Sequence, residues 1–492
     1  MPNAPKNLAR PERWTRAERL LLAVISGIIF LDALDASLVQ VALPSIGSSL
    51  HLADAQLQWI VSAYVLGYGG FLLLGGRCAD VLGRKRVLVW GLVAFVAASA
   101  LGTVVSDGTL LNAARFAKGA SAAFTAPAAL SILTTSFPEG PRRNGAIGIY
   151  TAAAAGGFTF GLVSGGLLTE ASWRYTFGIV VPAAVVLLVA ALRVVRRDET
   201  AAEPRRRRLD LGGALTITAA ALLFVRAVAA APSVGWVSPQ TLGGIALAAL
   251  LLAAFVVIER TVEQPLVRLA ILRSPSLVAA NVGALLLFGC ATTFNVVRTL
   301  YAQNVLGWGP LKTGIVFMAA SITTGLLAPR VGVIVTRIGA TATVLAGALA
   351  LIGCYMLFVV SGTTADYAVD IASLALAGAG FALAYPALNI QALRGVADDE
   401  QGLGSGLAGT SFQVGGAIVL AIATAVTVTH TPAHATAAQA VHGLHAGMAV
   451  PVVGAGLLAV MSAAALLRQH RASTSDVELL EAHEFEPLDQ AA

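Results

Sequence analysis

Two acids and two cations interrupt apolar stretches of this chain, where a charge is costly. Asp32 and Asp35 lie in the first apolar stretch, and Arg115 and Lys118 lie in the fourth. The members of each pair are three residues apart, so on a helix they share one face. Burial in a low-dielectric helix disfavours a charged carboxylate and lets it exchange a proton. The pattern therefore predicts proton binding at Asp35, with a permanent structural ion pair as the alternative.

The depths of these four charges in their predicted helices are similar. At ~1.5 Å per residue, they lie between about 9 and about 16 Å from the predicted outer helix ends. We therefore predict one four-charge cluster, in which Lys118 offsets the extra acid Asp32. In the same cluster, Arg115 modulates Asp35.

The elements that must position these charges are membrane helices. The 492 residues are 57% hydrophobic and only 12% charged, whereas soluble domains carry about 25% charged residues. Apolar stretches of about 20 residues, each long enough to cross a ~30 Å hydrocarbon core, recur along the chain. Fourteen helices are predicted, at residues 20–43, 58–76, 87–105, 109–133, 145–168, 175–193, 211–231, 240–258, 277–303, 311–335, 341–361, 367–393, 404–428 and 446–467.

The basic residues predict the orientation of the chain. With a cytoplasmic N-terminus, 26 of the 32 Lys and Arg residues fall on inner segments or inner helix ends. This asymmetry follows the positive-inside rule and requires an even number of spans. We expect a multi-pass protein of the cell (inner or plasma) membrane with both termini in the cytoplasm. The basic charge therefore reflects topology, and no nucleic-acid partner is expected.

The charged segments also divide the chain into parts. The predicted parts are a cytoplasmic N-terminus (1–19), an N-terminal six-helix bundle (20–193), a basic cytoplasmic linker (194–210), two additional helices (211–258), a second cytoplasmic linker (259–276), a C-terminal six-helix bundle (277–467) and a disordered cytoplasmic tail (468–492). An internal repeat supports this division, because the loop from Gly76 to Gly83 has a counterpart from Gly332 to Gly339. Duplicated halves are typical of secondary transporters.

Several motifs occur in the order expected of one family. The loop after the second helix has the spacing of an inner-loop signature, carried by Gly76, Asp80, Gly83, Arg84 and Lys85. Together with the motifs below, it makes nearly the whole chain resemble the major facilitator superfamily, and more closely its fourteen-span drug:proton antiporter branch. The resemblance implies two six-helix bundles with two extra helices between them. It also implies that this loop is a conformational latch; a solvated basic turn is the alternative reading.

The first and fourth helices carry two further family signatures. The segment from Leu34 to Pro44 is similar to the branch signature of the first helix, with Asp35 at its acidic position. Arg115 matches the family's proton-relay motif. Lys118 stands where the family usually has Gln, and Asp32 is an acid that the signature does not require.

The fifth helix resembles the antiporter motif in its glycines but has Leu162 in place of the motif's Pro. Small residues let helices approach closely, and without Pro the expected bend is in doubt. A tightly packed structural helix is the alternative. The glycines of the motif are Gly148, Gly157, Gly161, Gly165 and Gly166.

Polar and aromatic residues in both halves are candidates for the wall of a substrate cavity: Tyr64, Phe158, Asn295, Arg298, Tyr385, Phe412 and Gln413. Arg298 lies about 8 Å from an outer helix end, so snorkelling to the interface is the stronger alternative for it. Four histidines near the last outer connection suggest a solvated loop rather than a metal site, because no thiolate or carboxylate accompanies them. No metal is expected.

We expect a proton-coupled antiporter that exports a small amphipathic drug or antibiotic by alternating access. Export of an endogenous metabolite or amino-acid-like solute is an alternative, favoured by the cations Arg298 and Lys118 if the substrate carries a carboxylate. A membrane sensor that transports nothing is a further alternative. No nucleophile with its base and no phosphate-binding loop is visible, so an enzyme or ATP drive is not expected. The expected partners are the bilayer and a small-molecule substrate, with the proton as coupling ion, no cofactor, and a monomeric state.

Overall fold

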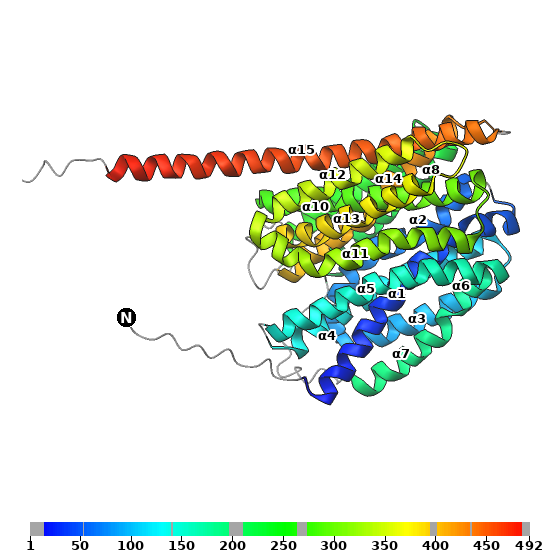
Figure 1. Cartoon of the computed structure of the whole chain (residues 1–492). Helices are drawn as coiled ribbons and strands as arrows, with labels where there is room; N and C mark the ends of the chain where they lie inside the picture. Colours follow the sequence, from blue (N-terminus) through cyan, green and yellow to red (C-terminus); the bar gives the residue numbers. More distant parts are fainter. Residues whose placement is uncertain are drawn as a thin grey trace, which may run out of the picture.

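The computed structural model describes residues 14–52, 54–138, 141–195, 210–262, 273–393, 401–432 and 435–484. Within these ranges the chain is built from helices joined by short connections, with no strand (Figure 1). The elements are α1 (Arg16–Leu50), α2 (Asp54–Leu82), α3 (Arg84–Val104), α4 (Gly108–Ser136), α5 (Pro141–Ala171), α6 (Arg174–Gly178), α7 (Val180–Val194), α8 (Leu211–Val234), α9 (Pro239–Thr261), α10 (Pro275–Leu300), the π-helical turn η2 (Tyr301–Val305), α11 (Pro310–Ile338), α12 (Ala340–Val359), α13 (Tyr367–Leu393), α14 (Gln401–Thr429) and α15 (Ala437–Glu484).

Length and hydropathy identify twelve helices, in the part of the chain that the structure describes, that could cross a membrane. In two of these spans, α6 with α7 and α10 with η2 each form one continuous segment. Helices α5 and α8 are the two predicted spans that do not meet the criterion. Among the described residues, α8 contains a shorter apolar segment, Gly212–Val228. The count of fourteen crossings stays a prediction.

Two sets of helices, α1–α7 and α10–α15, pack in the same way. In the first set α1 lies against α5 and α2 against α4; in the second α10 lies against α14 and α11 against α13. By this order α1 corresponds to α10 and α4 to α13. We call these sets the N half and the C half. They meet where α5 packs against α11 and α2 against α14.

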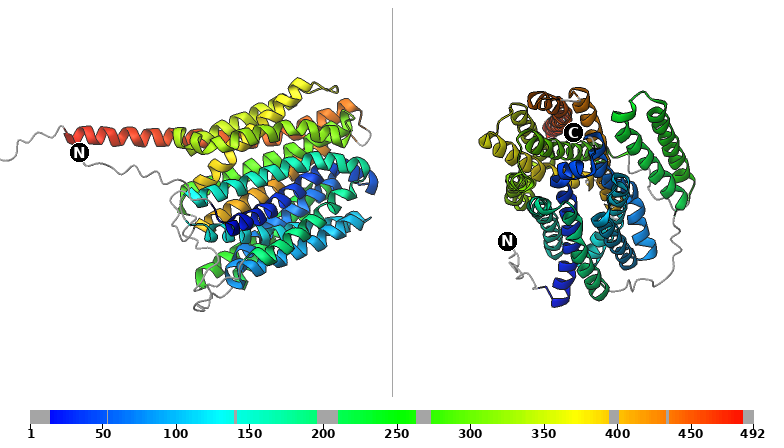
Figure 2. Two further views of the ribbon diagram at one scale, coloured as in Figure 1. Left: turned by 60° about the horizontal axis from the view of Figure 1, so that its bottom comes forward. Right: turned by 90° about the vertical axis from the view of Figure 1, so that its right-hand side faces the viewer.

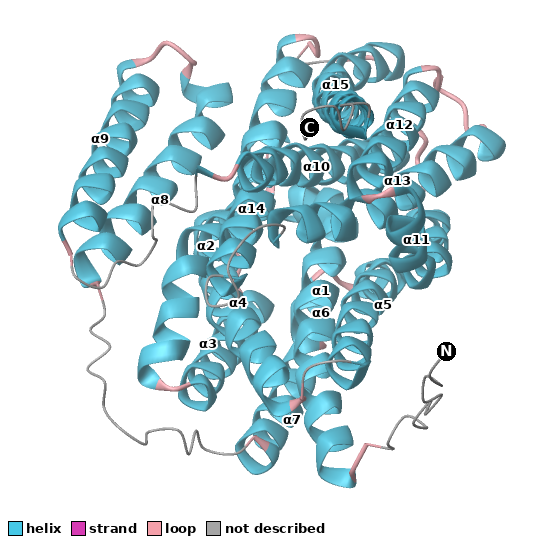
Figure 3. Cartoon of the chain, turned by 90° about the vertical axis from the view of Figure 1, so that its left-hand side faces the viewer, coloured by secondary structure: helices cyan, strands magenta, loops and turns pink. Residues whose placement is uncertain are grey.

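Helices α8 and α9 form a hairpin at the edge of the bundle, where α8 contacts α2 and α14 (Figures 2 and 3). The segments that precede and follow this hairpin, predicted as linkers, lie largely outside the described residues. We call the end of the bundle where α1 begins the terminus side, and the end where α1 stops at Leu50 the far side.

Helix α15 differs from the prediction. It continues to Glu484 and extends beyond the bundle on the terminus side (Figure 1), whereas the sequence analysis expects a disordered tail from residue 468. Residues 472–484 include two alanines, two leucines and three glutamates, which are strong helix formers. Intrinsic propensity therefore explains why the helix extends.

The turns of the internal repeat have the same backbone geometry. Gly83 ends the loop between α2 and α3 with φ +97°, and Gly339 ends the loop between α11 and α12 with φ +84°. A side chain disfavours this left-handed region, so glycine is needed at both turns. The duplicated sequence pattern therefore corresponds to a duplicated turn.

Two cations of the predicted latch hold neighbouring helix ends together. Arg84 Nη1 donates a hydrogen bond of 2.8 Å to Thr135 Oγ1 of α4. Lys85 Nζ donates one of 2.8 Å to the carbonyl of Leu192, near the end of α7, and also bonds the carbonyl of Val195. A cation at a helix C-terminus satisfies carbonyls that lack partners and opposes the negative end of the helix dipole. Asp80 lies near the end of α2, but its side chain falls outside what the structure describes.

Replacing Lys85 should weaken the packing of α7. We expect Lys85→Met to lower the free energy of unfolding by about 1–2 kcal/mol, because the two bonds to the end of α7 are lost. Chemical denaturation of the purified protein in detergent measures this change. The neighbouring Arg86 is exposed, so Arg86→Met is the matched control and should change stability little. Equal losses in the two variants would contradict the capping role.

Candidate functional site

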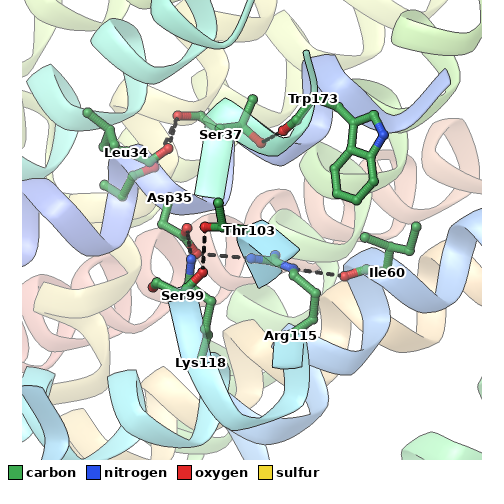
Figure 4. Close-up of polar contacts among 11 residues, drawn as sticks. Leu34, Asp35, Ser37, Ile60, Ser99, Thr103, Arg115, Lys118 and Trp173 are labelled. Carbon is green, nitrogen blue, oxygen red and sulfur yellow. Dashed lines mark hydrogen bonds and ion pairs between the residues drawn. The ribbon is translucent and has the colours of Figure 1, made fainter. Parts of the chain in front are cut away.

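A fully buried ion cluster joins α1 to α4 (Figure 4). Asp35 on α1 is 0% exposed, and Arg115 and Lys118 on α4 are 2% and 0% exposed. Arg115 Nη1 lies 3.0 Å from Asp35 Oδ2, and Lys118 Nζ contacts Asp35 Oδ1. Both oxygens of one carboxylate are therefore bound by cations, which offsets much of the cost of burying three charges.

The surroundings of Arg115 fix its orientation. Its Nε donates a hydrogen bond of 3.1 Å to the backbone carbonyl of Ile60 on α2. Its guanidinium lies 4.5 Å from the ring centroid of Tyr64, one turn further along the same helix. Arg115 therefore connects α4 with both α1 and α2.

Lys118 is surrounded by aromatic rings in addition to its carboxylate partner. Its Nζ lies 4.9 Å from the ring centroid of Phe95 on α3 and 5.1 Å from that of Phe177 on α6. Ring faces attract a desolvated cation. Asp35 and these two rings therefore hold the ammonium group of Lys118 in place.

Asp32 lies one turn before Asp35 and is bound differently. It is 7% exposed, and Thr125 Oγ1 donates a hydrogen bond of 3.4 Å to its Oδ2. Among the described residues, no cation lies within ion-pair distance of it. The sequence analysis expects Lys118 to pair with this acid. The structure instead places Lys118 on Asp35, so the expected pairing of Lys118 with Asp32 is wrong, whereas the expected contact of Arg115 with Asp35 is observed.

Tyrosines from two helices lie around Asp32. Tyr64 on α2 and Tyr150 on α5 are within electrostatic reach of its carboxyl group. Tyr68, also on α2, is within reach of Asp32 and of Tyr385 on α13 in the other half. Asp32 therefore lies near tyrosines of α2 and α5 that are themselves within reach of Tyr385 in the C half, whereas Asp35 is bound by side chains of the N half.

The glycines of α5 set the position of α1 and hence of both acids. A Cβ atom at Gly157 would lie 2.2 Å from the carbonyl oxygen of Phe30, and one at Gly161 would lie 2.0 Å from Ser37 Oγ. A Cβ at Gly165 would lie 3.1 Å from Leu38. Only glycine permits this approach at the first two positions, so the motif packs α1 tightly against α5.

Gly166, the last glycine of the motif, lies at the contact between the two halves. A Cβ at Gly166 would lie 2.7 Å from the carbonyl oxygen of Pro310 on α11. Leu162, which replaces the motif's Pro, is buried, and α5 is one continuous helix. The surroundings of Gly148 lie outside what the structure describes.

Of the predicted cavity residues, Tyr385 and Phe412 belong to one aromatic cluster of the C half. Their ring centroids are 4.7 Å apart, and Phe381 stacks on Tyr385 at 5.2 Å. The backbone of Gly69 on α2 approaches Gln413 on α14, so Gln413 lies where the halves meet. Tyr64 is buried under Arg115, and Phe158 and Asn295 are partly buried.

One described cavity, of about 300 Å³, lies elsewhere, between α2 and the α8–α9 hairpin. Its lining includes Trp59 of α2 and the exposed side chain of Arg226 of α8. None of the predicted cavity residues lines it.

Arg298 does not lie where the sequence analysis expects it. It is 1% exposed and forms an ion pair with Asp370 of α13, which is also 1% exposed. Arg298 therefore neither snorkels to the interface nor lines an open cavity. The sequence analysis missed Asp370, although both residues lie close to the predicted far ends of their helices and the depth arithmetic used for Asp35 would have paired them.

The histidines give no sign of a metal site. The rings of His430 and His442 are 6.3 Å apart, and His445 packs edge-on against Phe358. Within the described ranges no group of three His, Cys, Asp or Glu residues could hold a metal ion. His434 lies outside them.

Removing Asp35 should leave two adjacent buried cations without a counter-charge. We expect Asp35→Asn to cost about 3–5 kcal/mol of stability. Adding Lys118→Gln should recover at least about 1 kcal/mol, because neighbouring charges are not additive. Denaturant unfolding of the single and double variants measures this coupling. Arg226→Gln, which removes an exposed cation, is the control and should combine additively with Asp35→Asn. Additive losses for Asp35 and Lys118 would refute the pairing.

Curated proteins similar to this chain include several linked to antibiotics. It is 34% identical over 430 residues to the uncharacterized MFS-type transporter EfpA of Mycobacterium tuberculosis, covering 86% of this chain and 80% of that protein. It is 33% identical to the puromycin resistance protein pur8 of Streptomyces alboniger, covering 92% and 91%. It is 36% identical to the cephamycin export protein CmcT of Amycolatopsis lactamdurans, covering 81% and 82%.

Solved structures agree in fold. The nucleoside transporter NupG superposes with a TM-score of 0.64 at 13% identity, covering 91% of this chain and 98% of that one. A bacterial homologue of the human drug peptide transporters PepT1 and PepT2 gives 0.62 at 16% identity, covering 92% and 99%. The family model described as "Major Facilitator Superfamily" matches residues 25–420, which include the buried cluster and most of both halves. This multi-pass, all-helical membrane protein is a transporter, not an enzyme, and it belongs to the major facilitator superfamily.

Proposed function

We propose that this protein exports a small amphipathic drug or antibiotic in exchange for protons, by alternating access of its two halves. The observation that carries the proposal is the contrast between the two buried acids of α1. Asp35 is bound by two cations, whereas Asp32 has only a hydroxyl as hydrogen-bond donor among the described residues. Named relatives confer resistance to puromycin or export cephamycin, which supports cargo of this class.

We assign different roles to the two acids because their partners differ. From the sequence alone we expect Asp35 to take the proton, with Asp32 as a second acid beside it. In the structure Asp35 already has a cation bound to each of its oxygens. As a carboxylate, Asp32 is stabilised by fewer partners than Asp35, and it lies toward the junction of the halves. We therefore assign the exchanged proton to Asp32. Asp35, Arg115 and Lys118 then form a group of fixed charges. Their net charge is balanced by Asp32 only while Asp32 is ionised.

Charge balance provides a reason for coupling. With both acids ionised, the cluster of two carboxylates and two cations is neutral. Protonation of Asp32 leaves one excess positive charge in a low-dielectric interior, which disfavours a cationic ligand nearby. Loss of the proton restores a carboxylate among tyrosines and favours such a ligand. Proton and substrate would therefore exclude each other, as antiport requires.

The aromatic cluster around Tyr385 suits an amphipathic substrate. Rings at the junction of the halves offer apolar contact without a fixed shape. The metabolite alternative loses its main support, because both cations that favoured a carboxylate substrate, Arg298 and Lys118, are buried and paired with acids. Fourteen crossings with both termini in the cytoplasm, and a monomeric state, remain part of the proposal.

Proteoliposomes with an imposed pH gradient test the proposed function. We expect puromycin or ethidium to be transported against its own gradient by the wild type while the pH gradient lasts. Asp32→Asn should abolish this uphill transport but retain downhill exchange, because the variant mimics the permanently protonated acid. Asp35→Asn should abolish both, because the fixed charges are disrupted.

The exposed acid Asp107, which caps α4, provides the control. Asp107→Asn retains a capping side chain and should transport as the wild type does. A wild-type protein that carries a panel of such compounds equally well after a protonophore collapses the gradient would refute proton coupling. Full uphill transport in Asp32→Asn would refute the assignment of the proton to Asp32.

A further inference from the structure

The two halves contain buried ion pairs at corresponding places, with the charges exchanged. In the N half the acid, Asp35, is on the first helix and the base, Arg115, is on the fourth. In the C half the base, Arg298, is on the first helix, α10, and the acid, Asp370, is on the fourth, α13. Both pairs are at most 2% exposed. Corresponding helices thus carry opposite charges, and each half contains an ion pair that joins its first and fourth helices.

The pair in the C half is less well compensated. Arg298 Nη2 forms an ion pair with Asp370 Oδ1, but Asp370 Oδ2 and the Nε and Nη2 of Arg298 have no hydrogen-bond partner among the described residues. Asp35 by contrast has a cation on each oxygen. A buried carboxylate with one unpartnered oxygen loses comparatively little on protonation. Asp370 is therefore the acid of the two pairs that is better able to take a proton.

Arg298 has other favourable contacts that it can keep when Asp370 is neutral. Its guanidinium lies 5.0 Å from the ring centroid of Tyr301 and 5.6 Å from that of Phe358. The two rings stabilise a desolvated cation. Protonation of Asp370 would therefore not leave Arg298 isolated.

The rings also connect this pair to the contact between the halves. Tyr301 begins η2, whose π-helical geometry interrupts the end of α10, and such turns are frequent at functional sites. Two residues later, Gln303 Nε2 donates a hydrogen bond of 2.9 Å to the carbonyl of Val41 on α1. Asp35 lies six residues before Val41 on the same helix. The two buried pairs are thus joined across the halves through η2.

We propose that Asp370 is a second proton-binding residue and that its pairing with Arg298 controls the far-side contact between the halves through η2. This inference rests on the proposed proton-coupled function. A proton from the far side binds Asp370 Oδ2, the ion pair becomes a contact between a neutral acid and Arg298, and the guanidinium moves toward the rings of Tyr301 and Phe358. That movement shifts η2 and weakens the bond from Gln303 to α1; loss of the proton reverses it.

Several other titratable groups lie near the Arg298–Asp370 pair, and most of them differ from Asp370 in chemical type. They come from each neighbouring element: Tyr301 on η2, Lys312 beside Tyr367 at the start of α13, Cys354 on α12, Asp366 before α13 and His445 on α15. Asp366 is exposed and caps α13 by accepting hydrogen bonds from Ala368 and Val369. It is the one other carboxyl group in this set, so Asp366→Asn is the matched control.

Infrared difference spectroscopy of the purified protein tests proton binding without any substrate. On lowering the pH, the wild type should develop C=O stretches of protonated carboxyl groups, and one component, distinct from the one lost in Asp32→Asn, should be lost in Asp370→Asn and retained in Asp366→Asn. In Asp370→Glu, which preserves the charge and so guards against a folding defect in the amide variant, the band should shift in frequency. A band that is unchanged in both Asp370 variants would overturn the assignment, since the pair would then be a permanent structural one.

A second measurement tests the connection to the far side. Spin labels at Val104→Cys on the N half and Val360→Cys on the C half, both at strongly exposed positions, report the distance between the halves when Cys78 is replaced by Ser. Acidification should lengthen this distance in the wild type and leave it constant in Asp370→Asn. A wild-type response in Asp370→Asn would overturn the link. Failure of proton-driven transport would instead refute the proposed function, because neither measurement uses a substrate.

Discussion

The cost of burying charge in a low-dielectric interior is the constraint on which the rest of this structure depends. Asp35, Arg115 and Lys118 are at most 2% exposed, and such charges persist only where each has a partner at hydrogen-bond distance. That requirement sets the rotation of α1 and α4 about their axes and their separation. The glycines of α5 satisfy this requirement on the opposite face of α1. Because they have no side chain, α1 can lie close enough to α5 for Asp35 to stay at the level of its partners on α4.

The same constraint separates the two acids of α1. Asp35 is turned toward the interior of the N half, where two cations bind it, while Asp32, one turn away, is directed toward tyrosines at the junction of the halves. A helix places residues three apart on the same face, yet a small difference in angle is enough to give them different partners. Asp35 therefore contributes to the packing within one half, whereas Asp32 lies toward the junction between the halves.

Much of this arrangement can be predicted from the sequence. The rest depends on how helices are rotated against each other, which the sequence alone does not determine. Hydropathy and the spacing of charges place Asp35 and Arg115 in one layer, and the repeat from Gly332 to Gly339 matches an observed turn. The partner of Lys118 could not be predicted, because it depends on how α1 and α4 are rotated against each other. Asp370 was missed because an acid in the first turn of a helix resembles an ordinary N-terminal residue, although its depth is close to that of Arg298.

Both ion pairs lie within a half, which restricts how protons could drive an exchange between two states. A rigid rocking of the halves leaves contacts inside each half intact and changes only those between them. Protonation of a buried acid influences such a movement only through a group that touches both halves. Gln303, which follows Arg298 on the same chain segment and bonds to α1, is such a group. We therefore propose that the π-helical turn that carries it is the place where charge inside one half acts on the position of the other.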